Sequence, residues 1–251
     1  MNRRDAIVTL PGLLIVASYP NLANAGIDLS GALGAAQDAA KAATLSDDEV
    51  RKYAAQMAVY SDKQAKIAPA GSPYAARLTA LTSGLTEDAG LKLNFKCYVT
   101  KEVNAFAMAD GTIRLYSGLM DMMTDDELRY VVGHEMGHIK NGHTKKRMQT
   151  ALATSAAQKG VAASGTKAAV LADSQLGNLV ATVVRAQHSQ GNEREADDYS
   201  MQFMSRRKYD RKACVTALEK LVKLSGGAEA NWTSTHPSPK ERADRMRKQL
   251  A

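Results

Sequence analysis

The chain has 251 residues, a length that suits one sizeable domain or two small ones with a full hydrophobic core. Apolar residues make up 45% and charged residues 24%, which excludes a disordered or a collagen-like chain. The net charge of +7 belongs to residues 201–251, which hold twelve Lys and Arg against five Asp and Glu. Because few aromatic residues lie among these cations, we expect a solvated helix face rather than nucleic-acid binding, with peripheral contact to an anionic envelope membrane left open.

The first 25 residues have the features of an export signal. Residues 2–4 read Asn-Arg-Arg, residues 6–17 are apolar, and residues 23–25 read Ala-Asn-Ala, which resembles a cleavage site. We therefore expect a signal peptide over residues 1–25 and a periplasmic mature chain. The paired arginines leave twin-arginine export open beside the general route. No cysteine lies near the end of the apolar stretch, so a lipid anchor is not predicted.

Helices are predicted where capping signals precede helical spacing. Capping boxes at Ser46 and Thr124 open two helices, the first to about Ile67 and the second with a clear apolar face. Further helices are expected after Ser72, from about 179 through 203, from 211 to 224, and after Ser238. Residues 26–44 form an Ala/Gly-rich segment, and residues 150–173 are open between weak helix and a mobile connection.

Three strands are predicted in the middle of the chain. Residues 91–100 alternate strictly between apolar and polar side chains, which is typical of a half-buried strand. Residues 104–108 and 112–116 form two more, joined by a tight turn at Asp110-Gly111. The expected fold class is α+β, mostly helical, with a small antiparallel sheet of about three strands.

Cys97 and Cys214 are the only cysteines. An oxidising compartment would allow them to pair. They lie on different predicted elements, and Cys97 falls on the apolar side of its strand, so two separate buried thiols are favoured while a disulfide stays open.

The clearest chemical motif is His134-Glu135-Met136-Gly137-His138 on the helix that begins after Thr124. Residues four apart share a helix face, so His134 and His138 can both reach one zinc ion. Glu135 is offset beside them, where its carboxylate can take a proton from a water molecule that the metal activates. The alternative is a polar helix face with two ordinary histidines, and we favour the metal site.

A catalytic zinc needs a third protein ligand. His143 comes one residue too early for the spacing in which a histidine supplies it, and we expect His143 to be a surface histidine. Glu193 and Asp197 share a face of a later helix, so Glu193 could bind the metal while Asp197 orients a ligating histidine.

These residues give the sequence a family resemblance. The chain is similar to the gluzincin peptidases of the HtpX and CAAX prenyl endopeptidase type, and within them to a soluble periplasmic, LoiP-like branch. The resemblance extends from about residue 45 to residue 246, and besides the zinc helix its matching stretches are residues 104–108, 116–124, 174–179, 195–200 and 236–237.

The resemblance implies a zincin-like peptidase domain over residues 45–251 that holds one Zn2+ per chain through His134, His138 and Glu193. It implies that Glu135 is the general base and that Asp197 orients a ligating histidine without binding the metal itself. It also implies that His236 and Arg242 help to polarise the scissile carbonyl, although the residues alone are equally consistent with a loop histidine and one cation of a basic helix.

The resemblance further implies that residues 104–108 form an edge strand that pairs with an extended substrate, with Asn104, Ala105 and Phe106 as binding residues. An ordinary hairpin strand is the alternative. The sequence departs from the LoiP-like pattern in its lack of an anchor cysteine and in the positions of its two cysteines, so no disulfide carries over.

The leading interpretation is a zinc endopeptidase that hydrolyses misfolded or unfolded envelope proteins. The alternative is a chaperone-like quality-control factor with structural zinc, against which Glu135 argues because a structural site needs no base. An aminopeptidase would require a Gly-x-Met-Glu-Asn motif, which the sequence lacks.

Overall fold

The computed structural model describes residues 40–159, 171–224 and 231–250. The predicted signal peptide, most of the Ala/Gly-rich segment and residues 160–170 lie outside the described residues. The helices are α2 (Asp47–Gln64), α3 (Pro73–Leu81), α4 (Ser117–Met122), α5 (Asp125–Lys140), α6 (His143–Lys159), α7 (Asp173–Arg185), α8 (Gln190–Arg206), α9 (Ala213–Leu224), α10 (Asn231–Thr235) and α11 (Pro239–Leu250). None of these described helices is both long and apolar enough to cross a bilayer.

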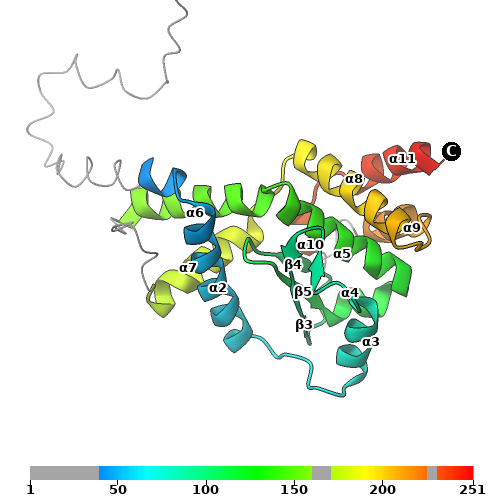
Figure 1. Ribbon diagram of the computed structural model, residues 1–251, viewed down its shortest axis with the longest axis horizontal. Coiled ribbons are helices and arrows are strands. Elements are labelled where there is room, and N and C mark those ends of the chain that lie inside the picture. Colours follow the sequence, from blue (N-terminus) through cyan, green and yellow to red (C-terminus); the bar gives the residue numbers. More distant parts are fainter. Residues whose placement is uncertain (1–39, 160–170, 225–230, 251) are drawn as a thin grey trace, which may run out of the picture.

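A three-stranded mixed sheet occupies the centre of the fold (Figure 1). Its strands, in spatial order, are β3 (Asn94–Tyr98), β5 (Thr112–Tyr116) and β4 (Ala105–Ala107). The expectation of an antiparallel sheet holds for β4 and β5 but is wrong for β3 and β5, which run parallel. The reason is the connection after β3, which carries the chain past the position of β5 to the far edge, so that β5 returns between its two predecessors.

The strand predicted over residues 91–100 is divided. Residues Leu91–Lys92 form β2, which pairs with β1 (Glu87–Asp88) in a separate hairpin, and β3 begins only at Asn94. The division occurs where Leu93 donates its N–H to Thr86 and Asn94 donates its N–H to Gly111.

The two faces of the sheet are buried against different helices. Ala105, Ala107, Ile113 and Leu115 join a core with residues of α5, α8, α9 and α11. Tyr98, Phe106 and Met108 join a second core with residues of α2, α6 and α7. The mostly helical α+β class expected from the sequence is confirmed, with helices on both faces of the sheet (Figure 1).

Two glycines bring α5 and α8 into close contact. A Cβ atom at Gly137 would lie 2.9 Å from the backbone of Ala196, and one at Gly133 would lie 2.7 Å from the Ser200 hydroxyl. Any larger residue would push the helices apart. The close approach directs the first turns of α8 at the face of α5 that carries the two motif histidines.

The helix predicted from about residue 179 through 203 is two helices. α7 ends at Arg185, Ala186 is extended, and α8 begins after Ser189, whose hydroxyl accepts a hydrogen bond from the N–H of Asn192. This break places His188 in a buried loop beside α5.

Cys97 and Cys214 are both buried and both free, as the favoured interpretation expected. Burial raises the pKa of Cys97 to about 11 and that of Cys214 to about 12, so neither thiol ionises readily.

Candidate metal centre

Four buried side chains converge where α5 faces α8. His134 and His138 come from α5, Glu193 from α8, and His236 from the loop before α11, and one ligand atom of each lies within 4.8 Å of the others. Nε2 of His134 lies 3.0 Å from Nε2 of His138. The carboxylate oxygens of Glu193 lie 3.5 Å from the first of these nitrogens and 3.3 Å from the second.

The geometry fits a zinc ion. Four ligand atoms at about 2.0–2.1 Å from a tetrahedral zinc are roughly 3.3 Å from one another, which agrees with the three separations above. Two imidazole nitrogens and one carboxylate are also a donor set that zinc prefers. His134, His138 and Glu193 would hold the ion.

The charges around this point favour a cation. Burial and Arg242 lower the pKa of His134, but the charge of Glu193 and the hydrogen bond that the ring donates to Asp197 outweigh them and raise it to about 9. Burial raises the pKa of Glu193, but the positive charges of His236 and Arg242 outweigh it, so this carboxylate stays ionised. Burial lowers the pKa of His138 well below its ordinary value, which keeps that ring in the neutral form that binds metals.

Glu135 lies beside the convergence with one oxygen unsatisfied. Its Oε1 atom is buried and has no hydrogen-bond partner among the described residues, and Nε2 of His236 approaches it at 3.6 Å. A buried carboxylate oxygen without a donor is rare unless a ligand or a water molecule supplies one. The atom is therefore available to accept a proton from a group bound at the centre.

Asp197 connects the candidate ligands to α11. Its Oδ1 atom lies 3.0 Å from Nδ1 of His134 and also accepts a hydrogen bond from the Tyr130 hydroxyl. Nε and Nη2 of Arg242 donate to the two Asp197 oxygens at 2.9 and 2.7 Å, and Nη1 of Arg242 forms an ion pair with Glu193. Arg242 therefore holds both carboxylates of α8 in place.

His143 is not the surface histidine that the sequence led us to expect, because it is only 7% exposed. Its Nδ1 atom lies 3.0 Å from Nδ1 of His138, and its Nε2 atom lies 2.9 Å from Oε2 of Glu195. A neutral His143 that donates to Glu195 accepts a hydrogen bond from His138, which leaves Nε2 of His138 free to face the centre. Sequence spacing could not show this, since Glu195 lies 52 residues away.

His188 is a second residue that the sequence did not reveal. Its ring stacks on His138 with 3.8 Å between centroids and lies 5.1 Å from the ring of His236, which in turn stacks on Trp232 at 4.3 Å. Nη1 of Arg147 lies 2.6 Å from Nε2 of His188. These rings pack around the centre, so His138 and His236 are held by neighbours as well as by their own backbones.

The strand β4 forms one edge of the sheet. Tyr116 donates its N–H to Asn104 and Met108 donates to Thr112, which makes 104, 106 and 108 the residues that bond to β5. The backbone groups of Ala105 and Ala107 consequently point away from β5, and both residues are 1% exposed. The Asn104 side chain accepts from the N–H of Ala105, and the Phe106 ring packs into the second core.

The structure thus gathers seven predicted residues into one buried group, namely His134, Glu135, His138, Glu193, Asp197, His236 and Arg242. The predicted substrate residues are not members of this group, since Ala105 and Phe106 lie on β4 and Asn104 directly precedes it. The individual roles of all these residues stay predictions.

The fold and the HExxH helix define a metallopeptidase. The chain belongs to peptidase family M48, whose family model matches residues 74–250. It is 44% identical to the metalloprotease LoiP of Escherichia coli (strain K12) over 252 aligned residues, which cover 100% of this chain and 98% of that protein. It is 37% identical to the metalloprotease YcaL of the same strain, over 90% of this chain and 89% of that protein.

Among solved structures, Ste24p of S. mikatae aligns over 76% of this chain and 55% of that chain, with 14% identity and a TM-score of 0.41. The family and its relatives make this protein a metalloendopeptidase that acts on polypeptides.

Proposed function

We propose that the protein is a zinc-dependent endopeptidase of the periplasm that hydrolyses unfolded or misfolded envelope proteins. The observation that carries the zinc site is the convergence of His134, His138 and Glu193, with three contacts of 3.0 to 3.5 Å between their ligand atoms. One ion per chain is proposed. The predicted signal peptide supports the location.

Zinc bound here would act as a Lewis acid on the attacking water and on the scissile carbonyl. Glu135 accepts the proton of that water and returns it to the leaving amine, a role supported by its buried and unsatisfied Oε1 atom. His236 faces Glu135 through Nε2 and is placed to donate a hydrogen bond to the developing oxyanion.

For Arg242 we propose a role other than the expected polarisation of the scissile carbonyl. Its guanidinium is 3% exposed and is engaged with Asp197 and Glu193. We assign it a positioning role, in which it fixes the two carboxylates and thereby the ligand geometry.

The edge position of β4 in the sheet supports binding of an extended chain. The backbone of Ala107 and the carbonyl of Ala105 face away from β5, where an unfolded polypeptide could pair with them, as in addition of a strand to a sheet. A folded substrate would have to release a segment first, which is why unfolded and misfolded proteins are proposed.

The test is cleavage of casein by the purified mature chain. Glu135→Gln keeps the size of the side chain and removes its basicity, so activity should fall at least about 1,000-fold while the bound zinc stays near one per chain. Zinc content is measured by elemental analysis. Full activity of Glu135→Gln would reject the mechanism, and stable binding of unfolded protein without any cleavage by the wild type would favour the chaperone-like alternative.

A further inference from the structure

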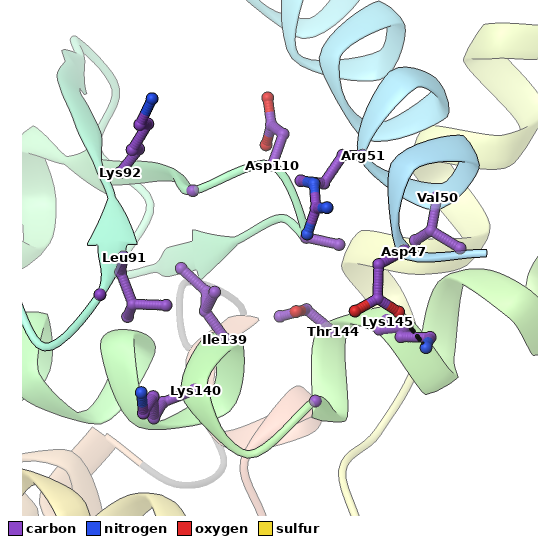
Figure 2. A pocket seen from close by; sticks show the side chains of 14 residues that line it. Asp47, Val50, Arg51, Leu91, Lys92, Asp110, Ile139, Lys140, Thr144 and Lys145 are labelled. Carbon is purple, nitrogen blue, oxygen red and sulfur yellow. Dashed lines mark hydrogen bonds and ion pairs between the residues drawn. The ribbon is translucent and has the colours of Figure 1, made fainter.

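A pocket of about 540 Å3 lies at one end of the sheet, away from the convergence of histidines. Its walls come from the start of α2, the hairpin of β1 and β2, the turn between β4 and β5, and the junction of α5 with α6 (Figure 2). We call it the basic pocket, after the lining residues Arg51, Lys92, Lys140 and Lys145.

Its four cations face two carboxylates, those of Asp47 and Asp110. Lys145 forms an ion pair with Asp47, and Arg51 forms one with Asp48, so Lys92 and Lys140 supply the positive charge that remains in the lining. The Asp110 carboxylate is already occupied by hydrogen bonds from the N–H and hydroxyl of Thr112 at 3.1 and 3.0 Å. Lys92 is exposed and has no ion pair among the described residues.

The floor of the pocket holds an unsatisfied donor. The Thr144 side chain is 2% exposed, and its hydroxyl has no hydrogen-bond partner among the described residues. In Figure 2 it lies between Ile139 and Lys145. Val50, Leu91 and Ile139 supply apolar surface nearby. Apolar walls, a free hydroxyl and ammonium groups suit a short apolar stem that ends in a carboxylate, as in glutamate or aspartate.

The pocket continues the path along β4. Ala109, Asp110 and Gly111 line it, and Ala109 is two residues, or about 7 Å, beyond Ala107 at the end of β4. On the other side, Ile139 and Lys140 follow directly after His138 on α5. A peptide that pairs antiparallel with β4 brings its N-terminal portion to this end of the strand.

We propose that the basic pocket is a substrate subsite that binds an acidic side chain on the N-terminal side of the scissile bond. The inference rests on the proposed peptidase function and adds a preference for acidic substrates to it. Removal of a cation from the pocket should lower kcat/KM for acidic substrates and leave kcat/KM for neutral substrates unchanged, because the pocket lies outside the catalytic group.

The experiment uses fluorogenic peptides that are identical except for Glu, Gln or Lys at each of the four positions before a common cleavage site. Wild type should show a kcat/KM about tenfold higher for Glu than for Gln at one of these positions. Lys92→Glu should remove this ratio or invert it in favour of Lys, with the Gln peptide changed less than about twofold. Lys66→Glu is the matched control, since Lys66 is exposed and lies outside the pocket lining.

Binding of the same peptides to the Glu135→Gln protein, followed by fluorescence anisotropy, measures the pocket without turnover. If the wild type cleaves none of the peptides, the proposed function is rejected. The ratio of the affinities for the Glu and Gln peptides then tests by itself whether the pocket binds an acidic side chain. An equal response to Glu and Gln at every position, an unchanged ratio in Lys92→Glu, or an acidic preference found only after the scissile bond would each overturn the proposal.

Discussion

Oδ1 of Asp197 lies 3.0 Å from Nδ1 of His134, and neither side chain is exposed to solvent. Since an ionised carboxylate only accepts, Nδ1 of His134 carries a proton, and Nε2 is the nitrogen that can give up its proton to bind a metal. The contact therefore sets the tautomer that a metal ligand requires and fixes the plane of the ring.

Asp197→Asn should weaken zinc binding about 10- to 100-fold, because an amide holds the His134 tautomer less firmly than a carboxylate does. The affinity is measured by competition with a chromogenic zinc chelator. Asp198→Asn is the control, since Asp198 contacts Arg245 and Gln249 and none of the candidate ligands. Equal zinc affinity in both variants would contradict the role of Asp197.

His143→Leu should reduce zinc affinity about tenfold, because Nδ1 of His138 loses its acceptor in a buried environment. Glu195→Gln should have a smaller effect in the same direction, since Glu195 acts only through His143. The same chelator assay applies, with exposed Lys146→Ala as the control on α6. A larger effect of Glu195→Gln than of His143→Leu would argue against this order.

His188→Phe should make stability less dependent on pH in the acid range. Burial lowers the pKa of His188, and the positive charge of Arg147 lowers it further, so the folded state holds this ring neutral while the unfolded chain protonates it below about pH 6.5. The unfolded state then binds more protons, and wild type loses up to about 1.4 kcal/mol per pH unit relative to the variant as pH falls below 6.5. Urea unfolding of the two metal-free proteins at pH 8 and pH 5 measures the change, and a constant difference would disprove it.

Asp62→Asn tests the contact between α2 and the sheet. Arg114 is 2% exposed on β5 and donates to both oxygens of Asp62, at 2.9 and 3.0 Å. Loss of the carboxylate leaves a buried cation, so the free energy of unfolding at pH 7 should fall by about 3 kcal/mol.

The difference in the free energy of unfolding between wild type and Asp62→Asn should disappear at low pH. Burial raises the pKa of Asp62, but hydrogen bonds from Arg114, Lys96 and Tyr98 outweigh burial and hold the pKa below its ordinary value. The stabilisation is therefore complete above the unfolded pKa and is lost as pH falls through the lower folded value. Unfolding curves from pH 7 to pH 3 should show wild type approaching the variant only below about pH 4.

Local signals in the sequence predicted the helix starts. At Ser46 and Thr124 both reciprocal hydrogen bonds of the capping box form, because they depend only on residues three apart. The break between α7 and α8 had a similar signal in Ser189 as N-cap, but the apolar periodicity on both sides concealed it.

The pairing of strands and the burial of side chains could not be predicted from such local signals. The alternation in residues 91–100 gives the faces of a strand and nothing about its neighbour, so the parallel partner of β3 could not be predicted. The seven gathered site residues follow from motif spacing and family resemblance. His143 and His188 were missed because their burial depends on Glu195 and Arg147, which reach them only through tertiary packing.

The proposed zinc ligands come from distant parts of the chain, since His134 and His138 belong to α5 and Glu193 belongs to α8. Both cysteines are free, so no disulfide restrains these segments. A bound ion would then serve as the tether between α5 and α8, and occupancy of the site would raise the melting temperature in proportion to the logarithm of free zinc. Metal supply would in this way regulate the lifetime of the folded protein as well as its activity.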